Sequence, residues 1–282
     1  MDLGATWLRA VAVDGTGRVI APSTAREELH RARGTGRKVA RERRPRPAPG
    51  QLPSTLRRLL RRWKLRADVL TVGAAGVGDA RARDAMRRTL SALAPRVIVL
   101  TDLETAWLAA LGGRAGILIL AGTGSCAYGR DACGHVARAG GEGPLLGDDG
   151  SAFWIGKQWV KTLPAHRILK LAHHPEVIRV TAALARTVLK RRASDKTARG
   201  ILREAHRALV SKVESVAGRL HFRGPIPLSW HGGLFRSPAF RKDFLRLLRR
   251  SRRSWSPIQP QARAEDAAAL LGLSMCHASK RM

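Results

Sequence analysis

The sequence contains the stretch Gly116-Ile117-Leu118-Ile119-Leu120-Ala121-Gly122-Thr123-Gly124-Ser125, in which a short apolar run leads directly into a glycine turn. An apolar run of this length, bounded by glycine, predicts a buried β-strand over residues 116–121. The amides and hydroxyls of the four residues that follow can form one half of a phosphate clamp. An ordinary glycine hairpin turn would have the same sequence, so this segment alone leaves both interpretations open.

Strands and helices alternate upstream of this stretch, which predicts parallel strand pairing and an α/β fold. Apolar runs predict strands at residues 68–73 and 96–100, and helical spacing of apolar residues predicts helices at residues 54–66, 79–94 and 103–111. Strands at residues 7–13 and 18–21 flank an Asp-Gly turn that suits a hairpin. Residues 25–53 are rich in proline and arginine and are predicted to form a loop or flap.

The downstream half begins in the same way and then becomes mainly helical. A second hairpin is predicted from residues 125–129 and 135–139, followed by a loop over 140–150 and a helix that begins at Ser151. Residues 164–222 have a helical pattern in which Leu202, Ala205, Leu209 and Val213 mark a buried stripe. A strand at 225–230 and an amphipathic helix at 262–278 complete the chain.

Asp102 lies where the strand predicted at residues 96–100 gives way to a helix. Ligand sites of open α/β sheets lie at the carboxyl ends of strands, and a carboxylate there can accept a proton from an attacking hydroxyl. The alternative is that Asp102 is simply the N-cap of the helix at 103–111.

The first residues, Asp2-Leu3-Gly4-Ala5-Thr6, form a second candidate phosphate loop. Gly4 would let the backbone approach phosphate oxygens, Thr6 adds a hydroxyl donor, and Asp2 can hold a hydrated Mg²⁺. Taken alone this pattern is weak, and it gains meaning from its order relative to Asp102 and the glycine turn at 122–125.

Composition limits the function classes that need to be considered. The formal net charge of +31 predicts non-specific attraction to polyanions, but no zinc-finger, helix-turn-helix or RNA-binding motif is present. The helix at 54–66 places Arg57, Arg58, Arg61 and Arg62 on one side, as expected of a solvated face. We expect three reduced cysteines, no membrane contact and a cytoplasmic location, because neither a bilayer-length apolar run nor a secretory signal is present.

The order of these segments resembles the BadF/BadG/BcrA/BcrD ATPase family, in the N-acetylglucosamine kinase-like branch of the actin-like ATPase superfamily. The resemblance spans nearly the whole chain. Its most specific part is Gly140-Gly141-Glu142-Gly143-Pro144-Leu145-Leu146-Gly147-Asp148-Asp149-Gly150-Ser151-Ala152-Phe153-Trp154-Ile155-Gly156, which is similar to the glycine pair, Gly-Asp-Glu-Gly-Ser and Ile-Gly of that branch. His231-Gly232-Gly233-Leu234-Phe235 resembles its adenosine motif.

The resemblance implies two actin-like (ribonuclease H-like) α/β domains around a cleft, at residues 1–112 and 113–282, with the last helix packing back on the first domain. It implies an ATP- and Mg²⁺-dependent kinase that phosphorylates a sugar or amino sugar, with Asp102 as general base. Substrate contacts would come from Asp102, Thr123, Gly141 and Asp148. ATP would be held by Gly4, Thr6, Gly122, Thr123, Gly124, Ser125, Gly232 and Gly233, and the metal by Asp2. A homodimer is one possible assembly.

Three departures from the family pattern bear on these expectations. Only Met1 precedes Asp2, so we expect the true start to lie upstream, and finding Met1 at the native N-terminus by mass spectrometry would refute this. Ser23-Thr24-Ala25 lacks the asparagine that contacts the sugar in relatives, and Glu142 stands where an aromatic residue is usual. The helical region at 164–222 is shorter than the corresponding region of the family members it resembles. The identity of the sugar therefore stays open.

Two other function classes remain in view. A BadF-type ATPase activator would share an iron-sulfur cluster between subunits, for which Cys126 and Cys133 are candidate ligands. A non-catalytic relative that binds nucleotide or nucleic acid would fit the short start, the missing asparagine and the high charge.

Overall fold

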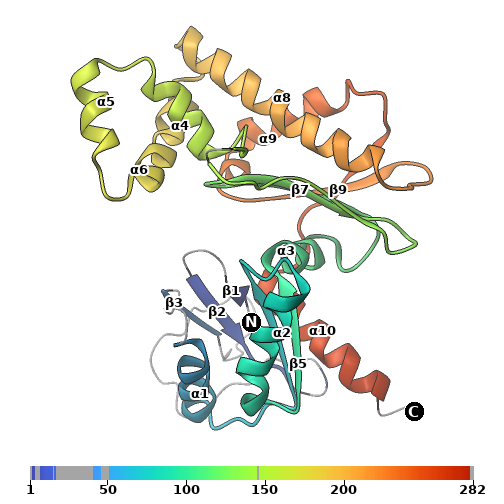
Figure 1. The fold of residues 1–282 in the computed structure, drawn as a ribbon. Coiled ribbons are helices and arrows are strands. Elements are labelled where there is room, and N and C mark those ends of the chain that lie inside the picture. The colour runs from blue at the N-terminus through green and yellow to red at the C-terminus, as the bar shows by residue number, and fades with distance from the viewer. Residues whose placement is uncertain are drawn as a thin grey trace, which may run out of the picture. The chain divides into compact units, whose positions relative to one another are not determined.

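The computed structural model describes residues 2–3, 7–14, 16, 41–45, 51–144 and 146–279, with the backbone alone described at 2–3, 7–10, 41–45 and 276–279. The chain divides into two compact units. Unit 1 is Met1–Gly112 with Ala262–Met282, and unit 2 is Gly113–Gln261. Each unit is built on its own sheet (Figure 1).

The described strands of unit 1 form a sheet in the order β3-β2-β1-β4-β5. These strands are β1 (Asp2–Leu3), β2 (Trp7–Val11), β3 (Arg41–Pro45), β4 (Val69–Ala74) and β5 (Arg96–Thr101). The pairs β1–β2 and β2–β3 are antiparallel, whereas β1–β4 and β4–β5 are parallel. The helices are α1 (Leu52–Arg62), α2 (Ala80–Leu90), α3 (Asp102–Leu111) and α10 (Ala264–Ser279), with the 3₁₀ turn η1 (Ser91–Leu93).

Apolar spacing explains how the helices of unit 1 pack. Leu52, Leu56, Leu59 and Trp63 lie on one side of α1 and are buried with residues of β4 and β5, including Val72 and Val99. Leu60, the residue after Leu59 in α1, is half-buried. Helices α3 and α10 pack against β4 and against each other. Helix α10 is far in sequence from the other elements of unit 1, yet it belongs to the same compact unit as the first 112 residues.

Unit 2 repeats the strand order of unit 1. Its sheet has the order β10-β9-β6-β7-β8, in which β6–β7 and β7–β8 are antiparallel and β6–β9 and β9–β10 are parallel. The strands are β6 (Gly116–Ala121), β7 (Ser125–Arg130), β8 (Val136–Gly140), β9 (Ile226–His231) and β10 (Trp255–Pro257). The first strand of each unit therefore occupies the centre of its sheet, with a hairpin on one side and parallel strands on the other.

Most helices of unit 2 come between β8 and β9. They are α4 (Ala152–Val160), α5 (Ala165–Ala172), α6 (Val177–Ala183), α7 (Ala185–Arg191) and α8 (Lys196–Gly218), and after β9 follow η2 (Leu234–Arg236) and α9 (Pro238–Leu248). Helix α8 packs against β7 and α9. The predicted stripe on this helix is confirmed, because Leu202, Ala205, Leu209 and Val213 are all buried.

Some sequence predictions of local structure were wrong. Residues 41–45, predicted as part of a loop, form β3 opposite β2 with Pro45 beside Trp7. Proline fits there because β3 is the edge strand and Pro45 is its last residue. Pro53 does not delay α1, since it occupies the first turn of that helix, where proline is tolerated. The predicted strand at 18–21 lies outside the described residues.

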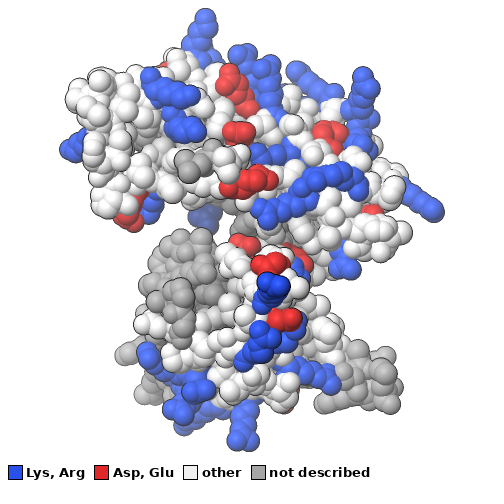
Figure 2. All heavy atoms as spheres, in the orientation of Figure 1, with Lys and Arg blue, Asp and Glu red and all other residues white. Residues whose placement is uncertain are grey.

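The charge of the chain is distributed as the sequence predicts. Arg57, Arg58, Arg61 and Arg62 are exposed on α1, which confirms the predicted solvated face. On the face drawn in Figure 2, lysine and arginine side chains are scattered over both units and acidic side chains are sparse. No helix among the residues that the model describes is both long enough and apolar enough to cross a bilayer.

His206 gives the fold of unit 2 a predicted sensitivity to acid. Its imidazole is buried on α8 with Nε2 3.0 Å from the carbonyl oxygen of Phe240. Because a carbonyl only accepts, Nε2 is the donor in this contact. Burial lowers the pKa of His206 from 6.5 to about 4, although Asp243 opposes the shift.

Stability should therefore fall as the pH drops from about 6.5 toward about 4, because over this range the unfolded chain binds a proton at His206 that the folded chain excludes. We expect a loss on the order of 2 kcal/mol between pH 7 and pH 5 from this group. Denaturant unfolding at the two pH values should show a smaller loss for His206→Gln, which keeps a donor for Phe240 without titrating. An equal loss in both proteins would contradict the prediction.

Candidate functional site

The parallel strands of unit 1 bring two predicted site segments to the same edge of its sheet. Leu3 of β1 lies opposite Ala74 of β4, and Ala74 lies opposite Thr101 of β5. The carboxyl ends of the three strands are thus aligned, and Asp102 follows Thr101 there. Gly4 and Thr6 come directly after β1 in sequence but lie outside the described residues. The backbone of Asp2 is part of β1, and its side chain is likewise not described.

The local structure at Asp102 leaves its carboxylate out of the helix cap. Thr101, not Asp102, is the N-cap of α3, and its hydroxyl accepts from the amide of Glu104 while the Glu104 side chain accepts from the amide of Thr101. The alternative interpretation, that Asp102 is the N-cap of this helix, is therefore wrong. Asp102 is the first helical residue and is half-buried, and its Oδ1 is 3.0 Å from the amide nitrogen of Leu103. The first turn of a helix favours a negative charge at this position.

The neighbouring carboxylate, Glu104, is committed to structure. It completes the capping box of α3 and also accepts from Nη2 of Arg83 at 3.3 Å. Arg83 in turn donates from Nε to the carbonyl of Val77 at 3.0 Å. Helix α2 and the turn after β4 are in this way tied to the start of α3, so Glu104 fixes the end of β5 where Asp102 lies.

In unit 2, backbone hydrogen bonds from the first turn of α4 hold the loop between β6 and β7 in place. The amides of Ala152 and Phe153 donate to the carbonyls of Gly122 and Thr123 at 2.8 and 3.2 Å, and the amide of Gly122 donates to the carbonyl of Gly124 at 2.9 Å. Within the described part of the chain, the amides of Thr123 and Gly124 have no hydrogen-bond partner. A turn with anchored carbonyls and two unbonded amides can bind an anion through those amides.

The side chain of Asp148 also supports this loop. It is 6% exposed, has a left-handed backbone with φ of 62°, and accepts from the Ser125 amide at 3.0 Å through Oδ1. A Cβ on Gly124 would lie 2.8 Å from Oδ2 of Asp148, so a larger residue there would displace the Asp148 carboxylate. The carbonyl of the next residue, Asp149, accepts from the Ser125 hydroxyl at 2.7 Å and from Nζ of Lys212 at 3.0 Å.

These contacts predict losses of stability of different size for two substitutions of Asp148. Asp148→Ala would leave the buried amide of Ser125 without its acceptor and place alanine in a left-handed conformation, so we expect a loss of about 2–4 kcal/mol in unfolding free energy. Asp148→Asn keeps an acceptor oxygen and tolerates that conformation, so its loss should stay below about 1 kcal/mol. Denaturant unfolding of both variants measures this, and equal losses would contradict the assigned contact.

Gly141, predicted to contact substrate, lies just beyond β8 in a loop that folds on itself. Its φ is +85°, and its carbonyl accepts from Nη2 of Arg138 at 2.6 Å. The amide of Gly147 donates to the carbonyl of Gly143 at 2.9 Å. A Cβ on Gly147 would lie 2.5 Å from Oε2 of Glu142, so the Glu142 side chain lies against this loop. The glutamate that replaces the usual aromatic residue thus lies next to the predicted sugar loop.

The turn after β9 meets the loop after β6. Leu120 pairs with His231 in the sheet, so the two turns begin side by side. Gly232 has φ of +110°, and a Cβ there would lie 2.4 Å from the carbonyl oxygen of Ala121 and 3.0 Å from the amide nitrogen of Gly122. Two predicted nucleotide motifs, 122–125 and 231–235, are therefore in direct contact within unit 2.

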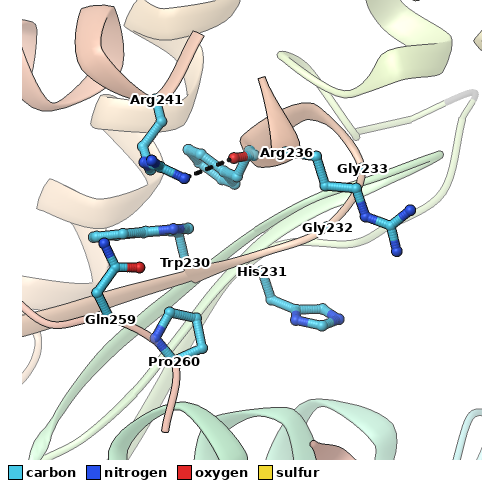
Figure 3. A pocket seen from close by; sticks show the side chains of 9 residues that line it. Trp230, His231, Gly232, Gly233, Arg236, Arg241, Gln259 and Pro260 are labelled. Carbon is cyan, nitrogen blue, oxygen red and sulfur yellow. Dashed lines mark hydrogen bonds between the residues drawn. The ribbon is translucent and has the colours of Figure 1, made fainter. Parts of the chain in front are cut away.

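A pocket of about 410 Å³ opens beside this contact, entirely within unit 2. Its lining combines the glycine turn with aromatic, amide and guanidinium groups: Trp230, His231, Gly232, Gly233, Phe235, Arg236, Arg241, Gln259 and Pro260. Figure 3 shows Arg241 above the Trp230 ring, with 5.7 Å between the guanidinium carbon and the ring centroid. Nη1 of Arg241 donates to the carbonyl of Phe235 at 3.4 Å.

Sequence reasoning missed several of these lining residues. Trp230 ends β9, Arg241 belongs to α9, and Gln259 follows β10, a strand that was not predicted. Only the fold brings them together, although Trp230 directly precedes the recognised motif. The structure thus places Gly122, Thr123, Gly124, Ser125, Asp148, Gly232 and Gly233 around one edge of unit 2, and Asp2 and Asp102 at one edge of unit 1.

Comparison with known proteins connects this geometry to a family. The model of the BadF/BadG/BcrA/BcrD ATPase family matches residues 1–272. An N-acetylmuramic acid/N-acetylglucosamine kinase of Clostridium acetobutylicum is 30% identical over 203 residues, which are 62% of this chain and 66% of that protein. The match thus spans just under two thirds of the relative's length.

Solved structures show the same fold at low identity. A protein of Porphyromonas gingivalis provisionally named an N-acetylglucosamine kinase superimposes with a TM-score of 0.70, at 17% identity and 97% coverage of each chain. A protein of Listeria monocytogenes provisionally named an N-acetylmannosamine kinase gives 0.67, at 14% identity and 98% coverage of each chain. These likenesses confirm the predicted α/β fold.

Proposed function

Because the chain belongs to the BadF/BadG/BcrA/BcrD ATPase family, we propose that it is an ATP-dependent kinase whose phosphoryl acceptor is an N-acetylated amino sugar. The relative's activity toward N-acetylmuramic acid and N-acetylglucosamine supports this acceptor class. The observation that carries the proposal is the loop at 122–125, with its unbonded amides, packed directly against the Gly232 turn.

In this proposal unit 2 binds the nucleotide. The amides of Thr123 and Gly124 donate to phosphate oxygens, while Asp148 and the first turn of α4 keep the loop in place. Gly232 and Gly233 let the chain turn closely past the nucleotide, whose base and ribose occupy the pocket beside Trp230. The amide of Gln259 and the guanidinium of Arg241, which lies over the buried Trp230 ring, are suited to hydrogen bonding and stacking with a purine nucleoside.

Unit 1 supplies the base. The carboxylate of Asp102 accepts the proton of the sugar hydroxyl as that oxygen bonds to the γ-phosphorus and the bond from phosphorus to the ADP oxygen breaks. Thr123 and Gly141 are proposed to contact the sugar directly. Asp148 is proposed to act on the sugar site indirectly, by holding the loop at 122–125 in place. Phosphoryl transfer depends mainly on alignment and on donors aimed at the developing charge, which the amides of 123 and 124 provide.

Mg²⁺ accompanies ATP in such reactions and neutralises charge on its phosphates. Asp2 lies one residue before the carboxyl end of β1, near the edge of the sheet at which Asp102 lies, and this position fits an oxygen ligand for the ion. Gly4 and Thr6 remain predicted phosphate ligands of the following turn.

The alternative of an iron-sulfur activator loses support from the position of Cys126. This cysteine lies in β7 and is 5% exposed, and burial raises the pKa of its thiol to about 11. A cluster shared between subunits needs thiolates that face a partner. Cys133, in contrast, is exposed, but it lies in the turn between β7 and β8 beside Asp131 and His135.

The proposal is tested by ADP release from Mg²⁺-ATP with a panel of sugars: N-acetylglucosamine, N-acetylmuramic acid, N-acetylmannosamine, glucosamine and glucose. We expect at least one N-acetylated sugar to raise the rate more than about a hundredfold over ATP alone, as sugar binding aligns the hydroxyl with the γ-phosphate. ADP release that no sugar accelerates would refute the kinase proposal and favour a non-catalytic or ATPase role.

A further inference from the structure

The turn between β7 and β8 gathers a second group of reactive side chains. One ligand atom each from Asp131, Cys133 and His135 lies within 4.8 Å of the others. The strand β7 separates this turn from Ser125 at its other end, a span of roughly 17 Å for five residue steps. The group therefore takes no part in the phosphate loop.

Asp131 organises the turn. Its Oδ1 accepts from the amides of Cys133 and His135 at 3.0 and 2.9 Å. Its Oδ2 lies 3.0 Å from Nδ1 of His135 and 3.3 Å from the amide nitrogen of His221, which joins the turn to the segment after α8. Burial by itself would raise the pKa of Asp131, but the hydrogen bonds from His135 and His221 hold it below its usual value.

The other two side chains are accessible from solvent. Cys133 is exposed, and the His135 side chain is 66% exposed, whereas that of Asp131 is fully buried. The ring of His221 lies edge-on to that of His135 with 6.2 Å between centroids. The site thus has one buried donor, the carboxylate of Asp131, and two solvent-exposed donors, the thiol of Cys133 and the imidazole of His135. An ion from solvent can reach it without unfolding of the turn.

We propose that Asp131, Cys133 and His135 bind a divalent transition-metal ion of the zinc class, with the ion replacing the proton between Oδ2 of Asp131 and Nδ1 of His135. Sulfur, nitrogen and oxygen donors favour Zn²⁺ over Mg²⁺ or Ca²⁺, which prefer oxygen alone. Binding releases the thiol proton of Cys133, whereas the proton on Nδ1 of the neutral His135 ring moves to Nε2 and leaves Nδ1 free for the ion. Water fills the fourth position, beside His221.

The spacing of the donors suits this ion. Tetrahedral zinc with bonds of about 2.0–2.3 Å separates its donor atoms by roughly 3.3–3.6 Å. The Asp131–His135 spacing of 3.0 Å and the 4.8 Å limit for the whole group bracket that value. Arg130 lies beside Gly134 of the same turn and opposes the charge of a cation, so the affinity should be below that of a sealed structural zinc site.

Cobalt provides the most direct test, because a thiolate bound to Co²⁺ gives a near-ultraviolet charge-transfer absorption. The untagged full-length protein, reduced with a phosphine and stripped with chelator, is titrated with Co²⁺. We expect this absorption to saturate at one ion per chain and to disappear on addition of Zn²⁺, which binds more tightly. Cys133→Ser should abolish the absorption, and His135→Gln should weaken Co²⁺ binding at least about tenfold.

Matched controls are a cysteine and an exposed histidine elsewhere in the chain, Cys276→Ser and His166→Gln, both of which should retain the wild-type titration. Circular dichroism checks that each variant is folded, and Zn²⁺ should raise the melting temperature of wild type but not of Cys133→Ser. Absence of the charge-transfer absorption at one equivalent, or its persistence in Cys133→Ser, would overturn the proposal. Neither result depends on kinase activity.

Discussion

Replacing Asp102 with asparagine should lower kcat for sugar phosphorylation by about 10²–10⁴-fold, the usual contribution of a general base. The side chain keeps its size and its place at the first residue of α3, so KM for ATP should change little. Asparagine cannot accept the proton of the sugar hydroxyl as a carboxylate does. Steady-state kinetics with the preferred sugar measures both constants.

The matched control for this variant is Glu104→Gln, two residues further along the same helix turn. Glu104 is committed to the capping box and to Arg83, and glutamine can complete a capping box as well. We therefore expect kcat within about threefold of wild type, since no catalytic group is removed. Similar losses in the two variants would mean that the start of α3 matters for structure alone, and would remove Asp102 from its proposed role.

Gly232→Ala should weaken nucleotide binding by displacing the turn after β9. The new Cβ would lie 2.4 Å from the carbonyl oxygen of Ala121, and the backbone at φ of +110° disfavours any side chain. The turn after β9 would have to move away from the phosphate loop. We expect a rise of at least about tenfold in the dissociation constant for ATP and a loss of about 1–3 kcal/mol in stability.

Gly200→Ala is the appropriate control, because Gly200 lies in α8 and a Cβ there meets nothing within 4 Å. This variant adds the same methyl group elsewhere in unit 2 and should bind ATP within about threefold of wild type. Calorimetric titration with a non-hydrolysable ATP analogue compares the two. Equal weakening by both substitutions would show that crowding at Ala121 is not the cause.

The sequence predicted those parts of the fold that depend on local patterns. Strands such as Gly116–Ala121 consist of apolar residues between glycines, and α8 shows its buried stripe directly. Arg41–Pro45 escaped prediction because an arginine-rich strand ending in proline resembles a loop, and its pairing with Trp7–Val11 spans about thirty residues. Trp255–Pro257 is too short for periodicity to register.

The candidate site shows the same division. The loop at 122–125 and Asp148 belong to contiguous glycine-rich motifs, so their identity could be predicted, although the hydrogen bond between Asp148 and the Ser125 amide could not. Thr101 rather than Asp102 caps α3 because Glu104 completes a capping box, a pairing that the residue types permit but do not require. Arg241 and Gln259 join the pocket only through packing of α9 and the segment after β10.

The central claim is that the γ-phosphoryl group of ATP is transferred to a sugar hydroxyl. Mass spectrometry of the products after incubation with Mg²⁺-ATP and each sugar of the panel tests it directly. The account predicts that an N-acetylated amino sugar gains one phosphoryl group in an amount equal to the ADP formed, and that Asp102→Asn forms far less of it. Equal amounts of ADP and inorganic phosphate, with every sugar unmodified, would contradict it.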